Sequence, residues 1–210
     1  MKIFKNYLLL GLLATAFIFS GCEDDDVPPE ENPEEEINRV IVNFTPVDDN
    51  NNPTGGTVVT AVWFDADFEG PNPPTQEEIT LSANTAYLLT WGIELELNGE
   101  TEDILGDDIS KEQDQHQFFF EFTADIFSSP MGNGNIDMRE AGAVNYLDQD
   151  VNGLPVGLET RWVTGAATTG TFTTVLKHQP PNGSTAVKTA TSNTTSGGTD
   201  IDIDWTLNIN

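Results

Sequence analysis

The sequence predicts an all-β fold: an antiparallel β-sandwich, immunoglobulin-like or of a related two-sheet type, with at most one short helix. Three observations predict it. Apolar and polar residues alternate with period two in several segments, turn-forming residues separate these segments, and only one segment has helical spacing. One face of each strand would then be apolar and the other hydrated, as is typical of antiparallel sheets.

The expected elements follow in chain order. Two β-rich segments, 40–44 and 57–64, are joined by a turn-rich stretch. Residues 102–113 could form the one short helix, with Thr101 as its N-cap and three apolar residues on one side: Ile104, Leu105 and Ile109. The remaining expected strands are 87–97, 116–122, 172–178 and 201–209, with a hairpin formed by 144–146 and 158–162.

The first residues have the pattern of an export signal. Lys2 and Lys5 precede an uncharged apolar run at 7–19, which is too short to cross a bilayer as a helix, since that needs ~20 residues. The motif Phe-Ser-Gly-Cys at 19–22 resembles the lipobox of bacterial lipoproteins. The resemblance implies cleavage after residue 21 and lipidation of Cys22, for example with palmitate, which would anchor the protein to a membrane. Cys22 is the only cysteine, so we expect no disulfide.

Residues 23–36 are expected to form a disordered acidic tether, because they are Glu, Asp, Pro and Asn apart from Val27 and cannot bury apolar area. The four acids at 23–26 also resemble the surface-export signal of Bacteroidota lipoproteins; the alternative is that they are only part of the tether. We therefore expect a signal peptide at 1–21, the lipidated cysteine and tether at 22–37, and a single β-sandwich domain at 38–210. The expected location is the outer membrane, exposed at the cell surface.

The charge of the chain limits its partners. With 35 acidic and 8 basic residues the formal net charge is −27. Phosphate contacts need clustered Lys and Arg, so nucleic acid is excluded as a partner, and cations are more natural ligands. No serine lies in a G-x-S-x-G motif, and neither histidine has zinc-protease spacing, so we expect no enzymatic activity. We expect a monomer.

The two histidines are expected to lie together. His116 begins the expected strand 116–122 and His178 ends the strand 172–178, and each has the parity of the apolar face of its strand. If the two strands run antiparallel, both imidazoles lie at the same end of the sandwich. With Glu112 or Asp114 nearby, they would suit Zn, Cu or Fe. The alternative is a pair of structural histidines, each hydrogen-bonded at the edge of the core.

One loop fits a calcium-binding pattern. Residues 148–159 match D-x-[DN]-x-[DN]-G-x5-E, and the candidate Ca²⁺ ligands are Asp148, Asp150, Asn152 and Glu159. The flanking residues have strand character, whereas an EF-hand needs helices on both sides. The alternative is therefore a hairpin with a turn at Asn152-Gly153.

The whole chain resembles small Bacteroidota outer-membrane lipoproteins that are often found beside TonB-dependent receptors. The features that carry this resemblance are the lipobox, the acidic tether, the strand segments DQHQFFF and LKHQP, and the loop DQDVNG. Such sequences are sometimes labelled type 1 periplasmic binding fold, although that fold needs two α/β lobes. The resemblance implies ligand capture for import, with a TonB-dependent receptor as partner. The leading hypothesis is a surface protein that binds a metal ion or small ligand, and the alternative is a structural or adhesive β-sandwich without a small ligand.

Overall fold

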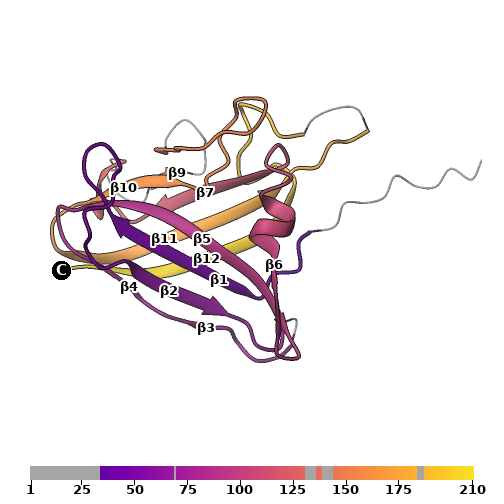
Figure 1. Ribbon diagram of the computed structural model, residues 1–210, viewed down its shortest axis with the longest axis horizontal. Helices are drawn as coiled ribbons and strands as arrows, with labels where there is room; N and C mark the ends of the chain where they lie inside the picture. The colour runs from indigo at the N-terminus through magenta and orange to yellow at the C-terminus, as the bar shows by residue number, and fades with distance from the viewer. Residues whose placement is uncertain (1–33, 69, 131–135, 139–143, 184–186) are drawn as a thin grey trace, which may run out of the picture. The chain divides into compact units, whose positions relative to one another are not determined.

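Two sheets make up the part of the chain that the structure describes. The computed structural model describes residues 34–210, apart from 69, 131–135, 139–143 and 184–186. The two sheets pack against each other through their apolar faces (Figure 1). The predicted all-β, sandwich-like fold is thus confirmed. No helix of the described residues is long and apolar enough to span a membrane.

The larger sheet is centred on two neighbouring strands, β1 and β5, whose alternating sequences put every second side chain into the core. Its described strand order is β3 (Thr75–Gln76), β2 (Val59–Phe64), β1 (Arg39–Pro46), β5 (Ala86–Leu97), β10 (Thr160–Thr164) and β8 (Phe127–Ser129), with β6 (Glu100–Asp103) also paired to β5. The described pairs in this sheet are antiparallel.

The smaller sheet carries both histidines. Its described strand order is β4 (Ile79–Leu81), β12 (Gly198–Ile209), β11 (Thr168–His178), β7 (His116–Phe122) and β9 (Ile136–Met138). The β4–β12 pair is parallel, and the other described pairs are antiparallel. β7 therefore begins where β11 ends.

Aromatic side chains fill the space between the sheets. Phe120 on β7 lies 5.1 Å from Trp162 on β10 and 5.8 Å from Phe172 on β11, measured between ring centroids. Phe118 stacks on Trp91 of β5 at 4.0 Å. The next residue of β7 toward its start, on the same face as Phe118, is His116, so the aromatic core ends at the histidine pair.

The short helix that the structure describes lies within the predicted range of 102–113, but it is shorter than expected and has a different N-cap. Residues 100–103 form β6 beside β5, and the helical segment η1 is a short π-helix, Leu105–Ile109, whose N-cap is Ile104 rather than Thr101. The reason is the Asn98-Gly99 dipeptide, whose φ values of 55° and 82° make the tight turn of a β-hairpin. The chain folds back onto β5 before the helical pattern can begin.

Two other expectations need adjustment. The hairpin expected between 144–146 and 158–162 consists of an isolated bridge, Tyr146 to Thr160, with a few backbone hydrogen bonds beside it. The last residues of the expected tether belong to the folded domain: Glu35 donates its backbone N–H to Asp200 of β12 at 3.1 Å, and Ile37 is buried. Cys22 and the acids at 23–26 lie outside the described residues.

A candidate metal centre at the end of the smaller sheet

The structure brings His116 and His178 together. They lie directly opposite each other in the antiparallel β7–β11 pair, and their rings stack with centroids 4.3 Å apart and planes 13° apart. Both side chains are almost fully buried. The strand register therefore produces the juxtaposition that the parity of the two residues predicts.

The protonation of His116 follows from its hydrogen bond. Its Nδ1 lies 3.1 Å from the backbone carbonyl of Glu112, and because a carbonyl can only accept, Nδ1 carries the proton and donates it. The neutral ring then presents a lone pair at Nε2. This atom is buried and has no hydrogen-bond partner among the described residues. Metal-binding histidines are commonly oriented in this way, with the second ring nitrogen donating to a carbonyl.

Two carboxylates face this lone pair. Oε1 of Glu35 lies 3.6 Å and Oδ2 of Asp200 lies 3.7 Å from Nε2 of His116, too far for a good hydrogen bond. The Asp200 side chain is fully buried, and its Oδ2 also has no hydrogen-bond partner among the described residues. Three electron-rich atoms thus converge, an arrangement that is unfavourable unless a cation or proton lies between them.

The spacing suits a transition-metal ion. Glu35, His116 and His178 each offer a ligand atom, and these atoms all lie within 4.8 Å of one another. Ligands ~2.1 Å from a tetrahedral ion are roughly 3.4 Å apart, so a closing movement of about 1 Å would complete the geometry. Asp200 is not one of these three, but its Oδ2 lies 3.7 Å from Nε2 of His116, so it could become a fourth ligand only after a further movement. We call these four residues the histidine cluster.

A β-bulge turns Asp200 toward the histidines. In the β11–β12 ladder, Leu176 pairs with Ile201 and Lys177 with Thr199, so Asp200 is an extra residue without a partner. Alternation alone would give Asp200 the same orientation as Asp202, on the hydrated face. Bulges locally re-aim side chains, which accounts for a buried carboxylate at this position.

Burial drives the histidine cluster toward its uncharged forms. Burial raises the pKa of Glu35 to about 7, with added repulsion from Asp108 and Glu112, and burial raises the pKa of Asp200 to about 7 as well. Burial, followed by repulsion from His178, lowers the pKa of His116 to about 4. A divalent cation would supply the positive charge that ionised carboxylates in this environment require.

The two carboxylates expected from sequence have different positions. Glu112 lies next to the cluster: its carbonyl orients His116, and its Oε2 lies 4.0 Å from Nε2 of His178. Asp114 is exposed and does not belong to the group of mutually close ligand atoms. Sequence reasoning missed Glu35, because it lies in the expected tether, and Asp200, because period-two alternation does not reveal a bulge.

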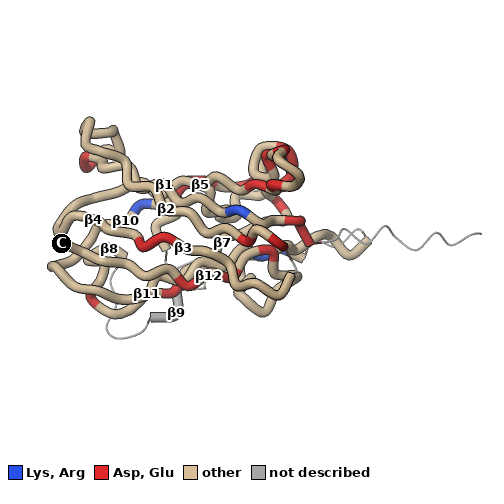
Figure 2. Tube along the Cα trace, turned by 90° about the horizontal axis from the view of Figure 1, so that it is seen from below, with Lys and Arg blue, Asp and Glu red and all other residues tan. Residues whose placement is uncertain are grey.

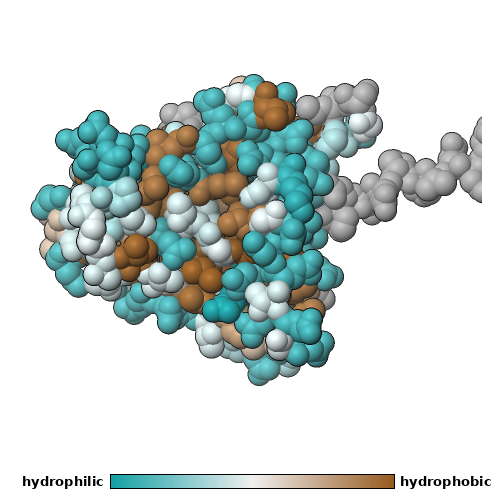
Figure 3. Space-filling model, viewed as in Figure 1, coloured by the Kyte–Doolittle hydropathy of each residue, from teal (hydrophilic) through white to brown (hydrophobic). Residues whose placement is uncertain are grey.

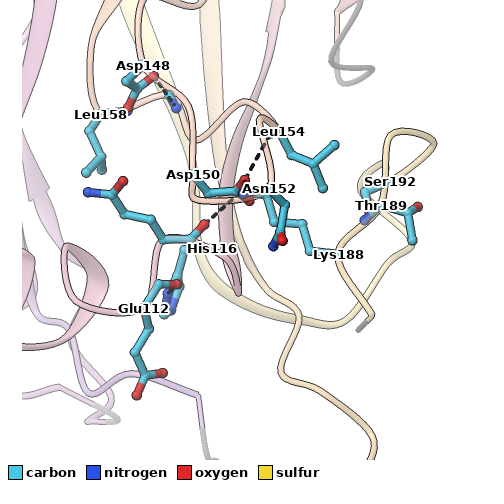
Figure 4. A network of polar contacts seen from close by, with 12 residues as sticks. Glu112, His116, Asp148, Asp150, Asn152, Leu154, Leu158, Lys188, Thr189 and Ser192 are labelled. Atoms are coloured by element: carbon cyan, nitrogen blue, oxygen red, sulfur yellow. Dashed lines mark hydrogen bonds and ion pairs between the residues drawn. The ribbon is translucent and has the colours of Figure 1, made fainter. Parts of the chain in front are cut away.

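The loop with the calcium pattern uses its acids internally (Figure 4). Both carboxylate oxygens of Asp148 accept backbone N–H groups, from Gly157 at 2.9 Å and Leu158 at 2.7 Å. Oδ1 of Asp150 accepts the N–H groups of Asn152 and Leu154 at 2.8 and 2.9 Å.

The remaining oxygen of Asp150 pairs with a lysine. Oδ2 lies 2.9 Å from Nζ of Lys188, with both side chains fully buried, and Nζ also donates to the carbonyl of Gln113 at 2.7 Å. Burial opposes ionisation of Asp150, but the hydrogen bonds from Leu154, Lys188 and Asn152 outweigh it and hold its pKa below the usual value. Burial lowers the pKa of Lys188 despite the neighbouring acids. We call Asp148, Asp150 and Lys188 the lysine cluster.

The other two candidate calcium ligands, Asn152 and Glu159, are exposed. Gly153 has a φ of +76° and its N–H bonds to the carbonyl of Asp150 at 3.0 Å, which closes a tight turn. This arrangement favours the hairpin interpretation of residues 148–159 over a calcium loop.

Acidic residues gather at the end of the sheets that carries η1 (Figure 2), the same end as the histidine cluster. Apolar side chains, in contrast, are partly exposed on the outer face of the larger sheet (Figure 3). A shallow groove there is lined by Val62 and Phe64 and bordered by Arg39, Glu77 and Glu96. Nothing in this groove combines buried, unpartnered polar atoms as the histidine cluster does.

The chain matches no protein-family model, and comparisons with curated proteins and with solved structures gave no match. The function therefore has to be inferred from the geometry and chemistry of the site.

Proposed function

We propose that the protein is a non-enzymatic lipoprotein that binds a divalent transition-metal ion through His116, His178, Glu35 and Asp200. The observation that carries this proposal is the buried lone pair of His116 Nε2, which faces two carboxylate oxygens at 3.6 and 3.7 Å without a hydrogen-bond partner among the described residues. A metal ion satisfies all of these acceptors at once.

The ligand types favour Zn²⁺, Cu²⁺ or Fe²⁺ over Ca²⁺ and Mg²⁺, because imidazole nitrogen suits the former and the latter take oxygen ligands. Four protein ligands would fill a tetrahedral shell. Catalytic zinc sites keep one position open for water or substrate, so a filled and buried shell supports binding rather than catalysis.

The direct test is a titration of the full-length protein, purified in mild detergent and stripped with chelator. We expect Zn²⁺ or Cu²⁺ to bind at one site by calorimetry. His116→Gln and His178→Gln should each weaken binding by at least ~100-fold, since losing even an outer-shell partner costs 10–100-fold. Asp114→Asn, which removes a nearby exposed acid, is the matched control and should bind as the parent does.

If both histidine variants bound the metal ion as tightly as the parent, the two histidines would have a structural role only. In that case each His→Gln change should cost only the ~1 kcal/mol of a lost hydrogen bond. The alternative function, a structural or adhesive β-sandwich, would then take the lead, and the partly apolar outer face of the larger sheet (Figure 3) would be the surface to examine.

The proposed location is the outer membrane, through lipidation of Cys22, with surface display directed by the acids at 23–26. The support is the sequence pattern around Cys22. Cys22→Ala should move the protein from the membrane fraction to the soluble fraction; a variant that stays with the membrane would refute the anchor. Replacing the four acids by Ala should protect the protein from protease added to intact cells, whereas unchanged cleavage would reduce them to a tether.

On this proposal the protein captures its ion at the cell surface and passes it to an uptake system, with a TonB-dependent receptor as the proposed partner. The resemblance to lipoproteins found beside such receptors motivates the idea. We expect a TonB-dependent receptor to co-purify with the lipidated protein. We also expect deletion of that receptor to reduce metal accumulation by the cells.

A further inference from the structure

We infer that the histidine cluster is a metal-dependent clasp, in which the bound ion holds the segment 34–36 against strand β12. The inference rests on the proposed metal binding and adds a conformational consequence to it. Metal loading would decide whether the chain is fixed to the domain from Glu35 onward or only from β1.

The four ligands come from two parts of the fold. His116, His178 and Asp200 lie on adjacent strands of the smaller sheet, whereas Glu35 lies on the segment that leads into β1 of the larger sheet, drawn in indigo in Figure 1. An ion bound by all four would therefore join this segment to the smaller sheet.

The segment is otherwise held by few contacts. Its hydrogen bonds to β12 join the N–H of Glu35 to Oδ1 of Asp200 at 3.1 Å and the N–H of Thr199 to Oε1 of Glu34 at 3.3 Å. Lys177 of β11 also attracts Glu34. Glu34 and Glu36 are exposed, and the buried apolar residues begin at Ile37. Segments with few buried apolar contacts open at low free-energy cost.

Charge makes the docking conditional. Docking places the Glu35 carboxylate close enough to Asp200 to repel it, and Asp108 and Glu112 add repulsion. Lys177 of β11 attracts Asp200 and Glu34, but it is not among the groups that act on Glu35. Ionised acids would push the segment away from β12. A divalent ion reverses the sign of this interaction, because it is attracted to both carboxylates.

The size of the effect follows from linkage. An ion that binds the docked form alone multiplies the ratio of docked to undocked forms by one plus its free concentration divided by its Kd, so an ion at 100 times its Kd raises this ratio about 100-fold.

Amide hydrogen exchange on the full-length protein in detergent, with and without Zn²⁺, tests the clasp. We expect Zn²⁺ to slow exchange in the peptides that contain Glu35 and Thr199 by at least ~10-fold. Glu35→Gln should abolish this protection. Glu36→Gln, which removes the adjacent exposed acid, is the matched control and should keep it.

Calorimetry on the same samples separates the two ideas. Zn²⁺ binding with protection in the parent and in Glu36→Gln, but not in Glu35→Gln, supports the clasp. Zn²⁺ binding without protection, or equal Zn²⁺ affinity in Glu35→Gln and the parent, overturns the clasp and leaves a site built on the two histidines. No Zn²⁺ or Cu²⁺ binding by the parent overturns the proposed function and the clasp with it.

Discussion

The histidine cluster and the lysine cluster both bury carboxylates, but they differ in how the acceptor atoms are satisfied. In the lysine cluster the two oxygens of Asp148 and the first oxygen of Asp150 each receive backbone N–H groups, and the second oxygen of Asp150 faces Lys188. In the histidine cluster Asp200 Oδ2 and His116 Nε2 face each other, and neither has a hydrogen-bond partner among the residues that the structure describes.

Under the proposed function, this difference is what separates the structural role of the lysine cluster from the binding role of the histidine cluster. A buried acid whose oxygens are filled by its own chain has no need of a ligand, even where its sequence matches a calcium motif. A buried acid that faces another acceptor is unfavourable unless a proton or a cation lies between the two. If the proposed function is right, the partners of the buried acceptors, including the ion pair of Asp150 Oδ2 with Lys188, are a better guide to function in this protein than motif matching.

The largest expected effect is on the lysine cluster. Lys188→Met leaves the Asp150 carboxylate buried without its countercharge and should lower the free energy of unfolding by ~3–5 kcal/mol in urea denaturation. Asp150→Asn should cost a similar amount. The control is Lys111→Met, which breaks an exposed ion pair with Asp107 and should cost no more than ~0.5 kcal/mol. A loss below ~1 kcal/mol for Lys188→Met would contradict the structural role of the pair.

The next effect is the pH dependence of zinc affinity. The pKa values of Glu35 and Asp200 are raised to about 7, so below pH 7 an ion must displace their protons, and affinity should fall about tenfold per proton for each pH unit between 7 and 5. Imidazole protonation should contribute little above pH 5 at His116, whose pKa is about 4. Calorimetry at several pH values checks this. Glu35→Gln should make the slope shallower; an unchanged slope would show that Glu35 is not a ligand.

A smaller effect of opposite sign is expected for Asp200→Asn. The folded state holds the Asp200 proton more tightly than the unfolded state, so this group favours folding below about pH 4, and that contribution is lost as the pH rises toward 7. Asn carries no charge and can donate to Nε2 of His116, so the metal-free variant should be ~1 kcal/mol more stable than the parent at pH 8, and less so at pH 5. The isosteric change thus stabilises one cluster and destabilises the other. If Asp200→Asn destabilised the metal-free protein at pH 8, the proposed difference between the histidine cluster and the lysine cluster would be wrong.

The smallest effect is that of calcium. Because the acids at 148 and 150 already have partners, 1 mM Ca²⁺ should raise Tm by no more than ~1 °C and give no measurable heat of binding. Glu159→Gln, which removes the exposed acid at the closing position of the motif, should leave this result unchanged. Binding in the micromolar range that is lost in Glu159→Gln would restore the calcium loop.

Much of the fold could be predicted from local patterns. The alternation in β12 and β5 identified both strands and their buried faces, because side-chain direction in a strand depends only on parity. The helix expected at 102–113 is confined to 105–109, because the Asn98-Gly99 turn adds a strand to β5 at the residues where the longer helix would begin. A two-residue turn signal thus shortened the helix from its N-terminal side.

Of the candidate site, the sequence predicted the two histidines but not Glu35 or Asp200 beside them. Parity was enough to place His116 and His178 on the apolar faces of their strands, and at the same end if the strands ran antiparallel. The pairing of β7 with β11 then brought them opposite each other. Asp200 reaches them through a bulge, which depends on how β12 pairs with β11 and leaves no mark on the alternation of β12 itself. Lys188, the partner of Asp150, lies in a loop rich in Thr, Ser and Gly that has no periodicity to interpret.

The sequence by itself determined the strand faces, the apolar core and the face of its strand on which each histidine lies, because each follows from local periodicity. The pairing of β7 with β11, which brings the two histidines together, belongs to the tertiary structure. Only the tertiary structure decided which acids share a site with them. Glu35 and Asp200 are 165 residues apart, and composition placed Glu35 in a solvated tether. Their approach depends on a bulge and on the docking of one segment against a distant strand. Such long-range contacts depend on the packing of the whole domain, and no short stretch of sequence encodes them.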